Sequence, residues 1–183
     1  MSSRYVLPVL AAGLLAAGCG TATVEGSSAT TTSERPTTVA FDPCDELSAE
    51  ALQAAGLDPA TKKTSVDSPD GQASAWKICR WRPADGQSYA VAVGSSTFTQ
   101  DDLPSNATVT GFEDVQIGSR AGKTYHEAGS SDLLRCFVSL PAQAGMHNII
   151  VDWDASERET APETPPCSLA VEKAQQLEPF LPQ

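Results

Sequence analysis

The sequence is poor in basic residues and in histidine, and both shortages exclude classes of function. Lysine and arginine number 12 against 23 aspartates and glutamates, which gives a formal net charge of −11. Nucleic acids and anionic lipid headgroups are bound through basic patches, so the acidic balance argues against both and predicts no nucleic-acid partner. The two histidines, His126 and His147, lie in separate segments, and neither belongs to an HExxH metalloprotease motif. We expect no cofactor.

Complete catalytic motifs are also lacking. GxSxG is absent, which removes the usual serine-hydrolase elbow. Ser74 and Lys77 match the SxxK motif of penicillin-recognising enzymes, but they fall in a predicted strand, where positions three apart point to opposite faces. Residues 118–124 are one residue short of a phosphate-binding loop and lie between two predicted strands. The sequence therefore favours a non-enzymatic protein and leaves an enzyme open.

One acidic segment has the spacing of a calcium-binding loop. Asp152, Asp154, Ser156 and Glu163 fall at positions one, three, five and twelve of an EF-hand pattern. The sixth position, which requires glycine, is Glu157, and a strand is predicted to enter the loop where a helix should. A solvated acidic loop is the preferred interpretation, with Asp152, Asp154 and Glu163 kept as a candidate metal site.

The first 19 residues have the pattern of a bacterial lipoprotein signal. Arg4 precedes an apolar run from Tyr5 to Leu15 that is too short to span a bilayer. Ala16-Ala17-Gly18-Cys19 resembles the lipobox, whose cysteine thiol accepts diacylglycerol and whose amine is freed by cleavage, although Ala16 stands where that motif prefers leucine. We predict a signal peptide over 1–18 and a lipid anchor, with acyl chains such as palmitate, on Cys19. The alternative is an ordinary secretory signal with Cys19 as a structural residue.

The segment after the lipobox predicts a tether. Gly20 to Ala40 is rich in serine, threonine and small residues and has no apolar periodicity, so residues 19–40 should be disordered. A flexible chain of this length reaches roughly 25 Å. Residues 41–183 then form one domain, held at the extracytoplasmic face of the cell membrane.

Helical patterns lie at both ends of that domain, with strand patterns between them. Asp42-Pro43 predicts a helix start, apolar spacing continues to Ala55, and Gly56 is a terminator. A second helical stripe begins at Cys167, and the polar stretch 61–71 predicts a loop. Strands are predicted over 76–81, 89–93, 115–117, 123–126, 133–140 and 148–153. This order predicts an α+β fold, an antiparallel β-sheet with an N-terminal and a C-terminal helix packed on it.

Four cysteines remain for this domain, and in an oxidising compartment they predict two disulfides. None forms a CxxC or CxxH pair, so their spacing disfavours zinc. Cys136 shares a strand face with Val138 and Leu140, the face expected to bury the helix that begins at Cys167. We predict Cys44–Cys79 and Cys136–Cys167, each worth roughly 3.5–4 kcal/mol in the chain-entropy model. Two other pairings stay open.

Several motifs in a fixed order carry a resemblance to a known family. They are the lipobox Cys19, the Ser/Thr-rich tether, Asp42-Pro43-Cys44 before a helix, Cys79-Arg80-Trp81, and a terminal helix led by cysteine. Together they resemble an actinobacterial lipoprotein family catalogued as domain of unknown function 3558, over most of residues 41–183. The resemblance implies a cell-envelope location and an α+β fold similar to the Mog1p/PsbP-like lipoproteins. It implies no activity.

The tryptophans point to a core rather than to a sugar-binding platform. Trp81 and Trp153 share strand faces with other apolar residues, whereas the position of Trp76 stays open. We therefore expect a membrane-anchored accessory lipoprotein that binds an envelope ligand or protein. The alternatives are an envelope enzyme assembled from separate strands and a structural or surface-antigen lipoprotein. An apolar cavity would favour the ligand-binding lipoprotein, and a cleft with clustered titratable groups would favour the envelope enzyme.

Overall fold

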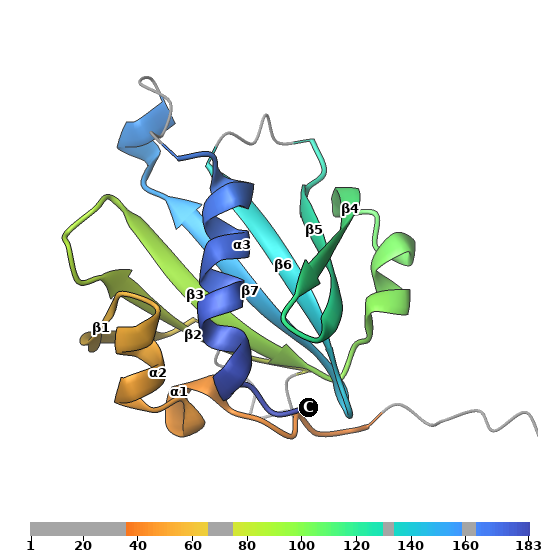
Figure 1. Ribbon diagram of the computed structural model, residues 1–183. Helices are drawn as coiled ribbons and strands as arrows, with labels where there is room; N and C mark the ends of the chain where they lie inside the picture. The colour runs from red at the N-terminus through yellow and green to blue at the C-terminus, as the bar shows by residue number, and fades with distance from the viewer. Residues whose placement is uncertain (1–35, 66–74, 130–133, 159–163) are drawn as a thin grey trace, which may run out of the picture. The chain divides into compact units, whose positions relative to one another are not determined.

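A seven-stranded antiparallel sheet is the centre of the computed structural model, which describes residues 36–65, 75–129, 134–158 and 164–183 (Figure 1). Residues 34–183 form one compact unit. The strand order is β1-β2-β3-β7-β6-β5-β4, so each strand pairs with the next one in the chain except that β3 pairs with β7 instead of β4. The strands are β1 (Leu57–Thr64), β2 (Trp76–Pro83), β3 (Tyr89–Ser96), β4 (Val109–Ile117), β5 (Arg120–Glu127), β6 (Arg135–Ala142) and β7 (Gly145–Trp153).

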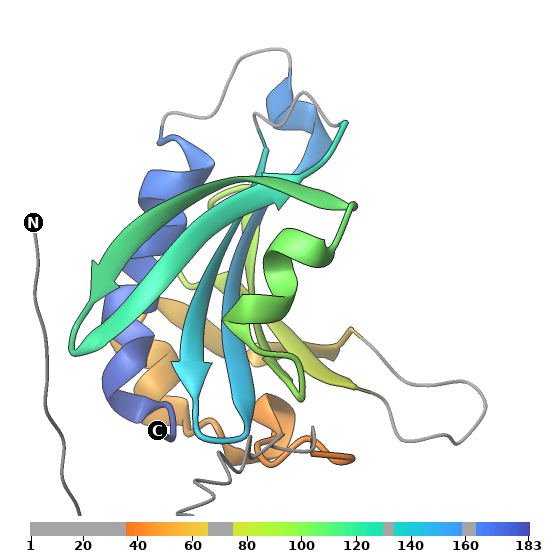
Figure 2. The same ribbon diagram turned by 90° about the vertical axis from the view of Figure 1, so that its right-hand side faces the viewer.

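The α-helices all pack on one face of this sheet. α3 lies across β6 and β7, while α1 and α2 lie over β2 and β1 (Figure 1). Viewed from the side, the green 3-10 helix η1 lies on the opposite face (Figure 2). The helices are α1 (Pro43–Glu46), α2 (Ala49–Ala54) and α3 (Pro166–Leu177), with 3-10 helices η1 (Gln100–Ser105), η2 (Ala155–Arg158) and η3 (Glu178–Phe180). The predicted α+β fold is confirmed.

The prediction of one continuous N-terminal helix is wrong. The Asp42 carboxylate caps α1 by accepting a hydrogen bond from the Cys44 N–H at 3.0 Å. The backbone then leaves the helical conformation at Leu47, and the Ser48 hydroxyl caps a second helix by accepting from the Ala51 N–H at 3.1 Å. A serine inside an otherwise helical pattern therefore restarts the helix, because its side chain competes for backbone donors.

The prediction of a polar loop from residue 61 is also wrong for its first part. Residues up to Thr64 belong to β1, which lies at the edge of the sheet and pairs with β2 alone. Leu57 is buried, but Lys62 and Lys63 are exposed. An edge strand with one covered end needs few apolar residues, and lysines suit it because they discourage pairing with other chains. Residues 66–74 lie outside the described part of the chain.

The main core fills the space between the sheet and the α-helices. Val91 and Val93 of β3 and Ile149 and Val151 of β7 lie at its centre, fully buried. Trp81 and Trp153 are buried in the same core, as predicted. The helices contribute Ala51, Leu52, Leu169, Ala170, Ala174 and Leu177.

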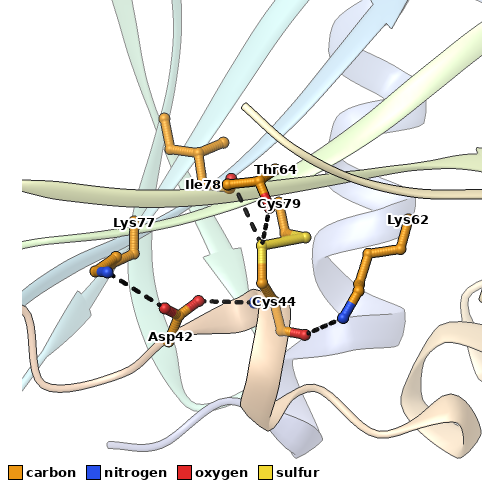
Figure 3. Close-up of a disulfide and its surroundings, with 7 residues drawn as sticks. All are labelled: Asp42, Cys44, Lys62, Thr64, Lys77, Ile78 and Cys79. Atoms are coloured by element: carbon orange, nitrogen blue, oxygen red, sulfur yellow. Dashed lines mark hydrogen bonds and ion pairs between the residues drawn. A yellow bond between two sulfur atoms is a disulfide. The ribbon is translucent and has the colours of Figure 1, made fainter. Parts of the chain in front are cut away.

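Both predicted disulfides are present. Cys44–Cys79 joins α1 to β2, and Cys136–Cys167 joins β6 to α3, with Cα atoms 5.1 and 5.0 Å apart. Figure 3 shows polar contacts around the first bridge, where Lys62 Nζ donates to the Cys44 carbonyl at 3.1 Å. Each bridge therefore links a helix to the strand on which that helix packs.

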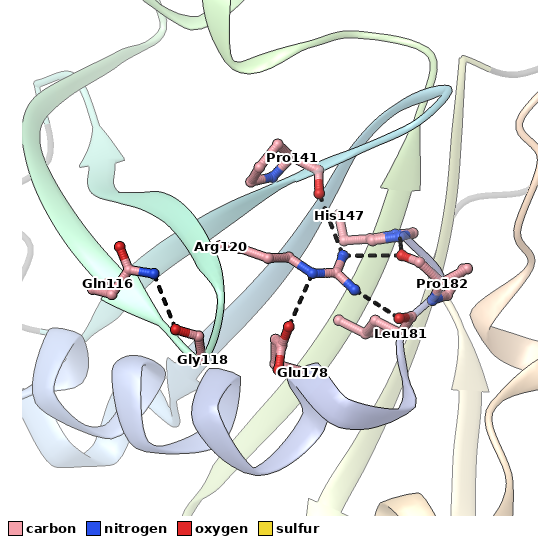
Figure 4. A network of polar contacts seen from close by, with 8 residues as sticks. All are labelled: Gln116, Gly118, Arg120, Pro141, His147, Glu178, Leu181 and Pro182. Carbon is pink, nitrogen blue, oxygen red and sulfur yellow. Dashed lines mark hydrogen bonds and ion pairs between the residues drawn. The ribbon is translucent and has the colours of Figure 1, made fainter.

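A buried arginine fastens the segment after α3. The Arg120 side chain is 3% exposed and its Nε lies 3.1 Å from Glu178 Oε1 (Figure 4). Its guanidinium also donates to the carbonyls of Pro141, Leu181 and Pro182 at 3.3, 2.7 and 2.9 Å. Glu178 balances the positive charge of Arg120, and the three carbonyls accept hydrogen bonds from its guanidinium. A buried guanidinium requires both kinds of partner.

Candidate functional site

The face opposite the α-helices carries a groove of about 970 Å³ that is open to solvent. Its floor is the sheet, to which Ile78, Phe137 and Ile150 contribute apolar side chains. One wall is formed by η1 and the chain after it, including Leu103 and Val109. We call this feature the sheet groove; Trp76, Phe98, Asp102, Ser105, Asn106, Ala107, Thr108, Tyr125, Glu127, Ala128, Met146 and Asn148 complete its lining.

Strand alternation explains why the floor is apolar. Phe137 lies between Cys136 and Val138 in β6, so it points to the face that those two residues leave. In β7, Ile150 lies in the same way between Ile149 and Val151. The central strands are thus apolar on both faces, one packed under the helices and the other forming the sheet groove.

A bulge in β4 brings a further aromatic ring to the groove side. The pairing of β4 with β5 is irregular between Thr110 and Glu113, and Gly111 there has φ +71°. A Cβ at Gly111 would overlap the His126 ring, so the position requires glycine. The bulge places the Phe112 ring 5.6 Å from the Tyr125 ring.

One polar pair lies in the groove floor. Asn148 Nδ2 donates to the Tyr125 hydroxyl at 2.6 Å, and both residues are 3% exposed. Asn148 Oδ1 is buried without a hydrogen-bond partner among the described residues. Burial raises the pKa of Tyr125, partly offset by the Asn148 bond, so the phenol stays neutral at physiological pH. The floor therefore offers neutral polar atoms to a ligand and no titrating base.

The charges at the groove are acidic and few. Asp102 and Glu127 line it, and the described lining residues include no lysine, arginine or histidine. The Asp102 side chain accepts from the Thr99 N–H at 2.8 Å and completes a capping box at the start of η1. Glu127 is held by Arg135 at 2.7 Å. The interior of the groove thus favours an uncharged apolar group.

The candidate metal ligands are engaged with arginines. Arg135 Nη2 lies 2.7 Å from Asp152, and Arg82 Nη1 donates to both Asp154 oxygens at 3.0 and 2.8 Å. Glu163 lies outside the described residues. Within the described ranges no group of three histidine, cysteine or acidic side chains could hold a metal ion. A cation at Asp152 and Asp154 would have to displace two arginines.

The remaining candidates from the sequence are scattered. His147 is buried on the helix-covered face, with Nε2 3.1 Å from the Pro182 carbonyl, and His126 lies in β5 beside the bulge. Residues 118–124 form the turn and strand of the β4–β5 hairpin. Lys77 pairs with Asp42 at 3.5 Å.

Two further candidates, Ser74 and Cys19, lie outside the described residues. No helix in the described ranges is long and apolar enough to cross a membrane.

The sheet groove itself is missing from the sequence-based predictions. The sequence does not predict the position of Trp76. In the structure Trp76 lines the groove, whereas Trp81 and Trp153 belong to the core. The sequence feature that indicates the groove is a run of apolar residues at successive strand positions, as at Ile149 and Ile150, because such a strand is apolar on both faces. A sheet with one solvated face would show polar residues at every second position instead.

Comparison with known proteins gives one match. A family model described as "Protein of unknown function (DUF3558)" matches residues 14–179. No curated protein matches the chain, and no solved structure does.

Proposed function

Because the chain belongs to the DUF3558 family, whose description states no activity, we propose a function from the chain's own features. It is an exported lipoprotein, anchored through Cys19 at the extracytoplasmic face of the cell membrane, whose domain binds an apolar ligand. The observation that carries the binding role is the sheet groove of about 970 Å³. The lipobox-like sequence before Cys19 and the two disulfides support the location, since such bridges persist in oxidising compartments.

The groove has the size and chemistry of a ligand site. Small-molecule sites are usually concave, about 300–1,000 Å³, mostly apolar and fitted with a few polar groups. Here aromatic and aliphatic side chains from five strands and η1 form the walls, and the Tyr125–Asn148 pair supplies the polar group. An apolar ligand gains about 25 cal/mol for each Å² of apolar surface that it buries. The paired strands beneath keep the floor in place before binding, which lowers the entropic cost.

The lining also favours binding over catalysis. Its titratable side chains among the described residues are Asp102, Glu127 and Tyr125, of which the first caps η1 and the second pairs with Arg135. Tyr125 stays protonated. The lining includes no histidine, lysine or cysteine from the described ranges to serve as nucleophile or general base.

The position of Trp76 allows a direct test of ligand binding. The mature chain carrying Cys19→Ser, which removes the competing acyl chain, is titrated with a brominated fatty alcohol that quenches tryptophan on contact. We expect saturable quenching that is lost in Trp76→Phe, because Trp81 and Trp153 lie on the other face. Ile78→Glu should weaken binding at least about tenfold by placing a carboxylate in the floor.

A matched control uses an exposed aromatic outside the groove. Phe180 in η3 is 40% exposed, so Phe180→Glu adds the same charge at an apolar surface position elsewhere. It should leave the quenching unchanged. Quenching that survives both Trp76→Phe and Ile78→Glu, or that Phe180→Glu abolishes equally, would overturn the proposed binding role.

The anchor is tested separately by mass spectrometry of the mature protein. The expected N-terminal peptide begins at Cys19 and carries a diacylglyceryl group and fatty acid. Cys19→Ser should abolish the modification, and the unmodified chain should leave the membrane fraction. A mature protein that retains Met1 would overturn this part of the proposal and leave the groove untouched.

A further inference from the structure

A second, smaller hollow adjoins the sheet groove on the same face. It holds about 200 Å³ and shares Ile78, Glu127, Phe137 and Ile150 with the groove, so the two are continuous over β2, β6 and β7. We call it the arginine hollow. The rest of its lining is Ser65, Arg80, Ala90, Ala92, Arg135 and Asp152.

Small side chains create this space. Arg80 follows Ile78 by two residues in β2 and therefore projects from the same face. Its partner across the ladder to β3 is Ala92, and Ala90 lies two residues further along that face. Alanine at both places leaves the surface beside Arg80 uncovered.

Among the described residues, none of the charges in the hollow pairs with Arg80. Arg135 binds both neighbouring carboxylates, with Nη1 2.7 Å from Glu127 and Nη2 2.7 Å from Asp152. These ion pairs raise the pKa of Arg135, so its positive charge is engaged with the two carboxylates that lie closest to it. Arg80 makes no hydrogen bond or ion pair with any residue in the described ranges. A half-buried guanidinium at the end of an apolar groove is therefore available to an anion.

We infer that the ligand is a single-chain anionic amphiphile, with its chain in the sheet groove and a carboxylate or phosphate on Arg80 in the arginine hollow. This inference rests on the proposed binding role of the groove. A guanidinium binds either anion through two parallel hydrogen bonds, so its chemistry fits both heads. The net charge of −11 does not oppose this, because exposed charges beyond about 10 Å are screened at 0.1 M salt.

Three ligands with the same twelve-carbon chain test the inference. Dodecanol, laurate and dodecyl phosphate, each below its micellar concentration, displace an uncharged fluorescent probe from the mature Cys19→Ser chain. We expect at least one of the two anions to bind about tenfold or more tightly than dodecanol. Arg80→Gln should remove that preference and leave dodecanol binding unchanged, and the anion that loses more affinity identifies the head.

Arg82→Gln is the charge-matched control. Arg82 lies two residues further along β2, outside the lining of the arginine hollow, and pairs with Asp154. It should keep the preference for the anion. Equal binding of all three ligands, or a preference that survives Arg80→Gln, would overturn the inference while dodecanol binding keeps the groove proposal intact. If none of the three ligands binds, both proposals fall.

Discussion

The two faces of the sheet are both apolar but are covered in different ways. On the helix-covered face, three α-helices, two disulfides and the Arg120 network close the core completely. On the opposite face, η1 and the β4 bulge cover a small cluster of Leu103, Tyr125 and Met146, and beside it lies the sheet groove. One face thus supplies most of the stability, and the other leaves apolar surface free for a ligand.

Substituting one arginine on each face should give the largest difference in the free energy of unfolding. Arg120→Ala removes the charge beside Glu178, which is 11% exposed, and four hydrogen bonds, so we expect a loss of about 3–5 kcal/mol in the free energy of unfolding. Arg135→Ala on the groove face, where the side chain is 36% exposed, should cost about 1 kcal/mol. Urea denaturation of both variants measures this, and equal losses would contradict the comparison.

Removing a disulfide should have the next largest effect. The Cys136–Cys167 bridge closes a loop with a sequence separation of 31, which corresponds to about 3.5–4 kcal/mol in the chain-entropy model. The double variant Cys136→Ala with Cys167→Ala should lose stability of that order in denaturant titrations. Because the bridge lies on the helix-covered face, the variant should still bind the groove ligand at temperatures where it is folded. Loss of binding in the folded variant would show that the faces are coupled.

Two neighbouring isoleucines compare the faces within one strand. Ile149 is fully buried under α3, whereas Ile150 lines the groove and is only partly buried. Ile149→Ala should cost about 3 kcal/mol because it leaves a cavity in a packed core. Ile150→Ala should cost less than about 1.5 kcal/mol and should instead weaken ligand binding. A larger stability loss at Ile150 than at Ile149 would reverse the assignment of the faces.

The smallest expected effect is a dependence of stability on pH. Burial, together with the charge of Arg120, lowers the pKa of His147 below 6.5, although the Pro182 carbonyl opposes the shift. Below pH 6.5 the unfolded chain then binds more protons at this site than the folded one, so stability is complete above pH 6.5 and falls as the pH decreases. The loss is at most about 1.4 kcal/mol per pH unit.

Unfolding free energies at pH 7.5 and 5.5 measure this contribution of His147. His147→Gln should flatten the difference between the two pH values, and His126→Gln on β5 should leave it unchanged. If the slope is the same in His147→Gln as in the natural chain, other groups account for it.

The parts of the fold that the sequence predicts are those with strong periodicity on one face. Cys136, Val138 and Leu140 alternate along a strand, and this pattern correctly predicts the covered face and the bridge to Cys167. Strand β1 escapes prediction because an edge strand needs little apolar surface, and Lys62 and Lys63 make it look like a loop.

The groove escapes prediction for a different reason. Its lining comes mainly from β2, η1, β4, β5, β6 and β7, and no local pattern tells which of these segments meet. Phe137 and Ile150 look like ordinary strand residues, since their neighbours on the other face are equally apolar. What distinguishes them is that η1 covers only part of their face, and a single 3-10 helix has no periodicity that would predict where it packs.

The strand order has a consequence for how the chain holds together. Strands β1 to β3 form one meander of the sheet and strands β4 to β7 form another. The β3–β7 ladder, from Tyr89↔Trp153 to Ser96↔Met146, is the seam that joins the two meanders. Each disulfide lies inside one meander with its own helices, so no described covalent bond besides the backbone crosses this seam. A single proteolytic cut between residues 97 and 108 would therefore yield two fragments, each with an internal bridge, held together by non-covalent contacts such as the ladder hydrogen bonds, core packing and the Arg82–Asp154 ion pair. In folding, this long-range ladder carries the largest closure entropy, so the two meanders can form before they join.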